Sequence, residues 1–243
     1  MKKMPVVILC GGKGQRLGEK TIDIPKPLIH IGDKPILWHV MKIYAAQGVN
    51  NFVLCLGYKH DEVVKYFKMN DIARKEGWTV HFEDTGLETS KSQRINKVLQ
   101  KGLVETDEFF LSYGDDVADV NIKKLLNQHK KYTPTVTISI VRLISEFGVV
   151  LSSPVTGAIT RFKEKPVLDE WMNGGFMVMN KMILNYLDNG ELEQEVFNAL
   201  VSDKQIRAYR HKGQWKAMNT LKDYMELTSL WHSGKAFWKI WEE

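Results

Sequence analysis

The chain is poor in cysteine, with two in 243 residues, and both stand inside apolar runs, at Cys10 and Cys55. Neither has the spacing of a metal-ligand set, so we expect two small buried side chains and no zinc site or disulfide framework. A chain of this length buries roughly 70–75% of its unfolded surface and needs no crosslink. The cysteine usage indicates a reducing compartment, and we expect a cytoplasmic protein.

Long apolar segments and clustered charge are also missing. The N-terminal apolar run breaks into glycines too soon for a signal peptide or a membrane-spanning helix. The net charge is +5, and the basic residues are scattered instead of forming an arm or stripe. The seven histidines show no ligand spacing. We therefore expect no membrane or nucleic-acid partner, although a weakly basic chain attracts phosphorylated substrates.

Strand-like and helical patterns alternate through the first half of the chain. The predicted strands are residues 6–10, 52–56, 78–82, 108–113 and 136–141, and the predicted helices are 36–47, 61–69, 92–101 and 122–131. This order is typical of an α/β fold whose Rossmann-like, mainly parallel sheet is flanked by helices on both faces.

The pattern changes after Phe147. Short β-like pieces at 149–151, 158–164 and 175–179 predict a small antiparallel β lobe laid over the edge of the sheet. A helix is predicted over 221–233. The aromatic stretch 237–241 that follows should pack against the body or against another subunit.

The first predicted strand runs directly into Gly11, Gly12, Gly14 and Arg16. Such a loop lets backbone N–H groups approach phosphate oxygens, and an arginine can bind phosphate in bidentate fashion. The spacing fits neither the dinucleotide-binding fingerprint nor the P-loop. A tight strand-to-helix turn explains the glycines alone equally well.

Two further charged residues strengthen the phosphate interpretation. Lys26 stands between Pro25 and Pro27, which stiffen the backbone and hold the lysine at a fixed reach. Asp115 follows the predicted strand 108–113. Ligands of such sheets bind outside the carboxyl ends of the strands, where the glycine loop and Asp115 both fall.

These motifs resemble the signature of the sugar-1-phosphate nucleotidylyltransferases, Gly-Gly-x-Gly-x-Arg-Leu followed by Lys-Pro-Leu. The resemblance covers nearly the whole chain and is greatest to the branch that uses CTP and glucose 1-phosphate. Further matching stretches are residues 32–39, 57–59, 84–86, 113–119, 164–166, 173–176 and 234–239.

The resemblance implies a glycosyltransferase-A-like nucleotidyltransferase fold in one domain, residues 1–243. Residues 1–145 would form the nucleotide-binding core, 146–220 the acceptor-binding β lobe with a metal-site segment, and 221–243 a C-terminal helical and aromatic tail. It also implies a homo-oligomer. The implied reaction transfers CMP from CTP to a hexose 1-phosphate such as glucose 1-phosphate with release of pyrophosphate, for capsule or cell-surface polysaccharide synthesis.

The resemblance also implies a role for each site residue. Catalysis would use Arg16, Lys26 and Asp115, and Mg²⁺ would be the cofactor. The nucleotide would contact Leu9, Gly11, Gly12, Gly14, Gln15, Arg16, Thr89, Arg94 and Gly114. The acceptor would contact Gly148, Glu164, Lys165, Asn173 and Gly174, and the metal would contact Asp115 and Asn219.

Three departures from the family pattern concern the metal or the acceptor. Asn219 stands where the family has a second metal-binding aspartate, and we hypothesise that Asp116 restores the lost charge. Residues 67–78 form a shorter, more charged excursion, and residues 91–94 replace a glycine-bearing loop. These changes leave two alternatives open: a CTP-dependent enzyme with a non-sugar acceptor such as L-glutamine phosphate, and a catalytically weakened nucleotide-binding regulator.

Overall fold

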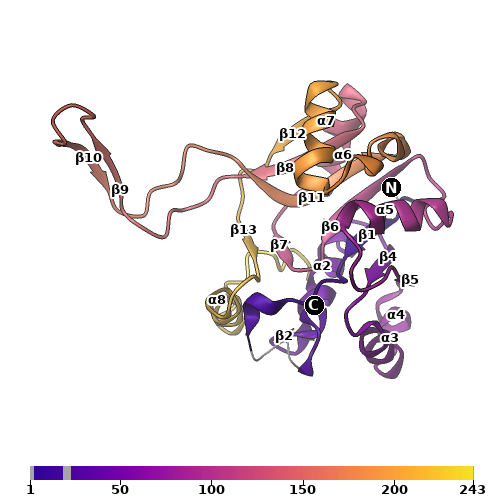
Figure 1. Ribbon diagram of the computed structural model, residues 1–243. Coiled ribbons are helices and arrows are strands. Elements are labelled where there is room, and N and C mark those ends of the chain that lie inside the picture. The colour runs from indigo at the N-terminus through magenta and orange to yellow at the C-terminus, as the bar shows by residue number, and fades with distance from the viewer. Residues whose placement is uncertain (1–2, 19–22, 243) are drawn as a thin grey trace.

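The computed structural model describes residues 3–18 and 23–242, and its centre is a seven-stranded sheet (Figure 1). The strand order is β12-β8-β11-β6-β1-β4-β5. The bounds are β1 Val6–Leu9, β4 Asn51–Leu56, β5 Thr79–Asp84, β6 Glu108–Tyr113, β8 Val136–Val141, β11 Met172–Asn180 and β12 Ile206–Arg210. β11 runs antiparallel to both of its neighbours, whereas the other neighbouring pairs are parallel. The mainly parallel sheet is therefore as predicted.

Helices cover both faces of this sheet. One face carries α2 Ile36–Ala45, α3 His60–Met69, α4 Ile72–Glu76 and α6 Ile122–Tyr132. The other carries α5 Lys91–Gln100, α7 Phe197–Ser202 and the short helical turns η3 Lys181–Asn185, η4 Leu187–Asn189 and η5 Leu192–Val196. Two further turns, η1 Gln15–Leu17 and η2 Lys26–Leu28, follow β1, and α8 Leu221–His232 lies near the C-terminus.

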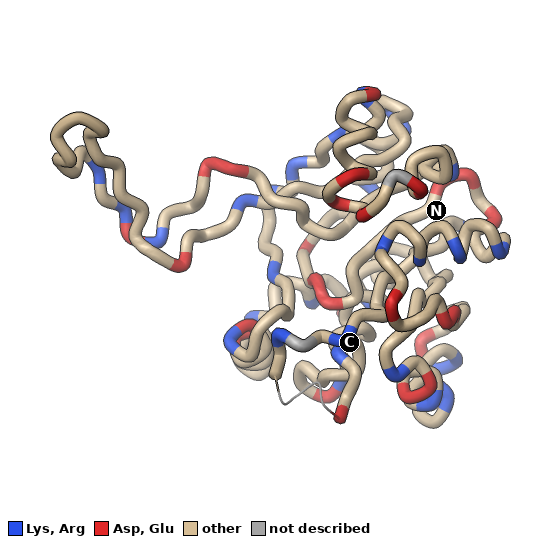
Figure 2. Tube along the Cα trace, in the orientation of Figure 1, with Lys and Arg blue, Asp and Glu red and all other residues tan. Residues whose placement is uncertain are grey.

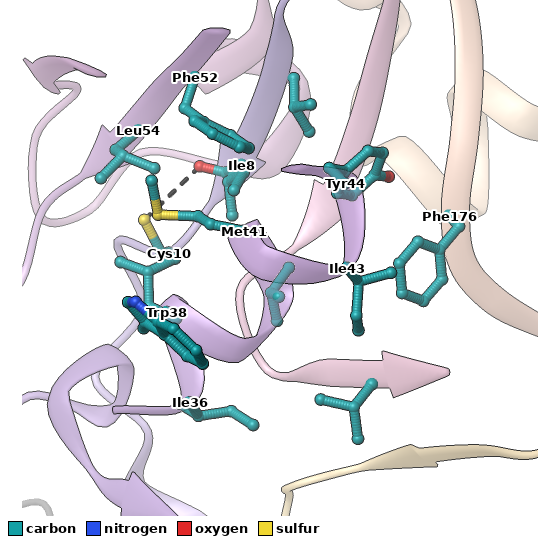
Figure 3. Packing of buried hydrophobic residues seen from close by; sticks show 14 of the residues in the cluster. Ile8, Cys10, Ile36, Trp38, Met41, Ile43, Tyr44, Phe52, Leu54 and Phe176 are labelled. Carbon is teal, nitrogen blue, oxygen red and sulfur yellow. Dashed lines mark hydrogen bonds between the residues drawn. The ribbon is translucent and has the colours of Figure 1, made fainter. Parts of the chain in front are cut away.

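The alternation of side chains along β1 divides the core in two. Val6 and Ile8 pack into the cluster beneath α2, whereas Val7 and Leu9 pack into the cluster beneath α5. Figure 3 shows the first cluster, where Ile8 lies among apolar side chains of α2 and of the neighbouring strands. Burying each such large side chain contributes about 1.5–3 kcal/mol, so the core fixes β1 and the loop that follows it.

Three two-stranded sheets lie outside the central one. They are β2 His30–Ile31 with β3 Lys34–Pro35, β7 Asp116–Ala118 with β13 Trp215–Ala217, and β9 Val149–Ser152 with β10 Ile159–Lys163. The β7–β13 pair matters for function because it joins two distant parts of the chain beside the end of β6.

The segment between β8 and β11, residues 142–171, projects away from the body, and we call it the arm (Figure 1). Its hairpin β9–β10 is exposed over nearly its whole length. The prediction that these pieces lie over the sheet edge is therefore wrong. The prediction that residues 175–179 belong to the small lobe is also wrong, because β11 pairs with β6 and β8 inside the central sheet.

The C-terminal aromatic stretch returns to the body, as predicted. Trp238 is fully buried, and its Nε1 donates a hydrogen bond to Nδ1 of His39 at 3.3 Å. Trp231 and Trp241 also pack around the His39 ring. Among the described residues, no helix has the length and apolar character needed to cross a bilayer.

Candidate active site

A cavity of about 730 Å³ opens at the carboxyl ends of β1 and β6. The two strands are paired in register, with Leu9 beside Tyr113, so the loops that follow them leave the sheet side by side. The wall comes from the glycine loop, from residues 87–94, from 113–116, and from 215–219. This volume is in the range of small-molecule sites.

The glycine loop forms one side of the cavity and is braced from behind by Arg94. The Arg94 guanidinium donates to the carbonyl oxygens of Leu56 at 2.9 Å, Leu87 at 3.2 Å and Gly11 at 3.4 Å. A side chain at Gly11 would overlap this guanidinium, so glycine is required there. Although Arg94 lines the cavity, it is only 5% exposed, and its hydrogen bonds make it a positioning residue.

Lys26, Asp115, Arg16 and Asn219 meet on the floor of the cavity. The Lys26 ammonium forms an ion pair with the Asp115 carboxylate. The Asn219 Oδ1 accepts hydrogen bonds from Arg16 Nη2 at 3.0 Å and from Lys26 Nζ at 3.2 Å. One amide oxygen therefore aligns two cations beside a carboxylate. Such a cluster suits a polyphosphate and its counterion.

Short local structures hold these groups in place. Lys26 begins η2, whose turn closes through the Leu28 N–H to Pro25 carbonyl bond at 2.8 Å. The pairing of β7 with β13 places residues 215–217 beside 116–118, and the Met218 N–H donates to the Asp115 carbonyl at 2.9 Å. Thr220 and Asp223 form the capping box of α8 immediately after Asn219. The cation cluster is thus built on ordered elements.

Asp116 is buried, only 4% exposed, yet it lines the cavity. Burial, together with the neighbouring Asp115 charge, holds the pKa of this carboxyl well above its ordinary value. A side chain at Gly175 would overlap the Asp116 carboxylate, so the glycine in β11 provides the space that this carboxylate occupies. No residue that the structure describes donates a hydrogen bond to this carboxylate, which leaves its oxygens available to a ligand.

These oxygens fit a hard divalent cation. Asp115 and Asp116 offer carboxylate oxygens, the donor type that Mg²⁺ prefers. Within the described ranges there is no group of three or more His, Cys, Asp or Glu side chains that could hold a metal. The remaining ligands would therefore be triphosphate oxygens and water. Asn219, whose Oδ1 is held by Arg16 and Lys26, is better placed to align those cations.

A linked group of four side chains lies beside the cavity, and of these the sequence reasoning assigned only Asn173. Lys91 forms an ion pair with Glu193, and its ammonium lies 4.7 Å from the centre of the Tyr113 ring. The Tyr113 hydroxyl donates to Glu193 Oε1 at 2.6 Å and accepts from Asn173 Nδ2 at 3.2 Å. The unusual 91–94 segment was the only sequence signal for this group.

The structure brings most of the predicted site residues together. Those lining the cavity are Leu9, Gly11, Gly12, Gly14, Arg16, Lys26, Thr89, Arg94, Gly114, Asp115, Asp116, Asn173 and Asn219. The side chain of Gln15 lies outside the described part of the protein. Gly174 is packed against Ser139 and Val141.

The three other predicted acceptor residues lie on the arm. A side chain at Gly148 would contact Phe162 and Glu164, so these positions are neighbours within the arm. Glu164 and Lys165 are exposed there and do not line the cavity. Their role in binding the acceptor stays a prediction.

Neither cysteine is suited to nucleophilic chemistry. Cys10 and Cys55 are free and buried, as predicted. Burial raises the pKa of the Cys10 thiol to about 12. The cavity wall beside Cys10 also carries cations, carboxylates and hydroxyl groups.

Comparison with known proteins agrees with this geometry. The nucleotidyl transferase family matches residues 5–233. The chain is 36% identical to a probable glucose-1-phosphate cytidylyltransferase of Bacillus subtilis and 38% identical to a glucose-1-phosphate cytidylyltransferase of Salmonella typhi, with 98% of this chain and 100% of each relative covered. A putative glucose-1-phosphate thymidylyltransferase from Bacillus anthracis has the same fold, with a TM-score of 0.75 at 16% identity over 99% of this chain and 98% of that structure.

Proposed function

The chain belongs to the nucleotidyl transferase family, and from this we propose that it transfers CMP from CTP to a hexose 1-phosphate such as glucose 1-phosphate. The relatives at 36–38% identity are glucose-1-phosphate cytidylyltransferases and align over nearly the whole chain. The observation that carries the proposal is the meeting of Arg16, Lys26 and Asp115 opposite the glycine loop.

The reaction needs little from the protein beyond position and charge. A phosphate oxygen of the acceptor attacks the α-phosphorus of CTP, the bond to the bridging α–β oxygen breaks, and pyrophosphate leaves. In this proposal Lys26 neutralises charge on the reacting phosphates, and Arg16 holds the departing pyrophosphate. The glycine loop, which has few side chains in the way, would let backbone N–H groups come close to the phosphates of the nucleotide.

The family generally uses a divalent metal, and we take the ion here to be Mg²⁺. When bound, it would neutralise triphosphate charge and polarise the phosphorus that is attacked. Asp115 and Asp116 would hold it. The protein's own contribution is to keep Lys26 beside Asp115, so that the lysine would add its charge next to an ion held by that carboxylate.

For the acceptor we propose a site that starts at Asn173 on β11 and is completed by Gly148, Glu164 and Lys165 of an arm. Because the arm projects from its own body, a second copy of the chain is the natural source of that arm, and we infer a homo-oligomer (Figure 1). A cytoplasmic location, where CTP is made, fits this reaction.

A substrate matrix tests the function. The purified full chain is incubated with Mg²⁺ and CTP, UTP, dTTP or GTP, each with glucose 1-phosphate or L-glutamine phosphate. Pyrophosphate release and the product mass are then measured. We expect turnover with CTP and glucose 1-phosphate, and loss of at least a hundredfold in kcat in Lys26→Met, since a charged contact to the reacting phosphate is removed.

The other outcomes each favour a different function. Turnover with L-glutamine phosphate alone would replace the sugar acceptor, and turnover with another base would replace CTP. Tight CTP binding without turnover on any acceptor would instead support the nucleotide-binding regulator.

A further inference from the structure

Five cationic side chains line the cavity in the described part of the chain: Lys13, Arg16, Lys26, Lys91 and Arg94. A cytidylyl transfer brings two anions together, the triphosphate and the acceptor phosphate, and their mutual repulsion must be offset by nearby positive charge. The partners of each cation indicate which of the two phosphates it can serve.

Four of the five are engaged away from an acceptor phosphate. Arg94 is buried and donates to backbone carbonyls behind the glycine loop. Arg16 and Lys26 converge on Asn219, on the side where the triphosphate is proposed to bind. Lys13 belongs to the glycine loop itself and pairs with Glu88 at 2.7 Å. Lys91 therefore remains.

Lys91 has other partners than the Arg16 and Lys26 pair, namely Glu193 and Tyr113. It begins α5, and Ser90 and Gln93 fix that helix end through a capping box. Lys26 lies on Asp115 and Asn219, whereas Lys91 lies over the Tyr113 ring, and both side chains line the cavity. Two separate cations are thus available for the two phosphates that react.

The Lys91 side chain is also available for a ligand. It is 46% exposed, and its ammonium is held by Glu193 and the face of Tyr113. An ammonium has three N–H donors, so it can keep Glu193 and still bind a phosphate oxygen. Tyr113 links this position to Asn173, the predicted acceptor contact, through the 3.2 Å hydrogen bond.

We propose that Lys91 binds the phosphate of the acceptor, while Glu193 and Tyr113 orient its ammonium from behind. The assignment rests on the proposed function, because it takes the acceptor to be a phosphate monoester. It makes Lys91 a specificity residue that this chain carries in its 91–94 segment, within the body and independent of the arm.

The test compares the effect of each variant on the KM for CTP with its effect on the KM for the acceptor. KM for CTP and KM for the acceptor are measured in wild type, Lys91→Met, Lys91→Arg and the control Lys101→Met. The control removes an ion pair between Glu83 of β5 and the lysine that caps the other end of α5. We expect Lys91→Met to raise the acceptor KM at least tenfold with the CTP KM changed less than twofold. Lys91→Arg should recover most of the affinity, and Lys101→Met should match wild type.

Two results would overturn the assignment: an unchanged acceptor KM in Lys91→Met, or equal increases in both KM values. If wild type turns over no acceptor, the proposed function fails, and Lys91 is judged by calorimetric titration of inorganic phosphate into the CTP-saturated protein. Weaker phosphate binding by tenfold or more in Lys91→Met then supports the assignment. Equal binding, or no binding to wild type, contradicts it.

Discussion

Asn219 is a neutral residue that aligns two cations, Arg16 and Lys26, through its side-chain oxygen. Its Oδ1 accepts from Arg16 and Lys26, and its backbone N–H donates to Asp223 at 3.1 Å. Hydrogen bonds to charged groups are worth about 1.5–3 kcal/mol each, so losing the amide should misalign both cations. We expect Asn219→Ala to lower kcat by roughly 10–100-fold at saturating substrates and Mg²⁺.

Asn219→Asp is the matched variant for this prediction. It keeps the oxygen and adds a charge, so it should retain most of kcat and lower the Mg²⁺ concentration needed for half-maximal rate. A Mg²⁺ titration of wild type and both variants measures this. If Asn219→Ala behaves as wild type, the amide does not align the cations.

Asp116 leads to a separate prediction about the metal. Its oxygens have no donor among the described residues and face the cavity beside Asp115. If they hold Mg²⁺, Asp116→Asn should raise the half-maximal Mg²⁺ concentration by about tenfold or more, because an amide cannot release a proton to become an anionic ligand when the ion binds. Asp116→Gly, the residue of the family pattern, should do the same. An unchanged Mg²⁺ dependence in both variants would show that Asp116 is only a turn residue.

Local motifs account for the site residues that could be predicted from the sequence. Arg16, Lys26 and Asp115 each lie within a few residues of a strand end or a proline turn, so the motif and its position in the sheet are visible together. The Lys91–Glu193 pair joins residues 102 positions apart. Its formation depends on the packing of η4 and η5 against α5, which no local pattern encodes.

The docking of α2 and α6 depends on neutral histidines, and this makes stability sensitive to pH. His39 donates from Nε2 to the Ile31 carbonyl at 2.9 Å and accepts from Trp238, and burial lowers its pKa to about 4. His129 is buried beside Thr137, and burial lowers its pKa to about 4 as well. Both side chains are therefore uncharged in the folded protein near neutral pH.

The direction in which stability changes with pH follows from proton binding in the folded and unfolded states. The unfolded chain binds a proton to each histidine below a pH of about 6.5, whereas the folded chain resists it until about 4, so stability is present above 6.5 and is lost as the pH falls. When the pH is lowered from 7 to 5, each histidine should reduce the free energy of unfolding by about 2 kcal/mol. Urea unfolding at both pH values, in wild type, His39→Gln and His129→Gln, measures this. Each variant should show a smaller decrease than wild type.

Strands and helices with a clear period were predictable, whereas strand partners were not. The runs that became β1, β4 and β6 are continuous and apolar because both faces of the sheet are covered. β11 carries the same character, yet its place between β6 and β8 is set by pairing with residues far along the chain. Its position between short β pieces in the sequence led to its assignment to the lobe, because long-range pairing leaves no local signal.

The arm projects from the body of the protein and exposes a large apolar surface (Figure 1). Eight of its large apolar side chains are exposed: Ile144, Phe147, Val150, Leu151, Val155, Ile159, Phe162 and Val167. The hairpin tip between β9 and β10 carries no charge, as Figure 2 shows. An isolated two-stranded hairpin is at best marginally stable in water, and exposed apolar surface of this extent marks an interaction site. The proposed homo-oligomer would cover this surface with a second copy of the chain.

If a second copy covers the arm, removing apolar side chains from the arm should separate the copies. We expect the double variant Val155→Ser, Phe162→Ser to shift the mass measured by light scattering toward the 28.0 kDa of one chain. The control is Met69→Ser, which removes an exposed apolar side chain from α3 on the body and should leave the mass unchanged. A wild-type mass of 28.0 kDa would contradict the prediction at once.

If the arm also supplies Glu164 and Lys165 to a neighbouring cavity, two inactive proteins should restore each other. Lys26→Met has a defective cavity and an intact arm, whereas the double variant Glu164→Gln, Lys165→Met has the reverse. After dissociation and reassembly of an equal mixture, roughly a quarter of the sites combine an intact cavity with an intact arm from another copy, and we expect about that share of wild-type activity. An arm that serves its own cavity gives no such recovery, because every chain in the mixture then carries one defective half of its own site.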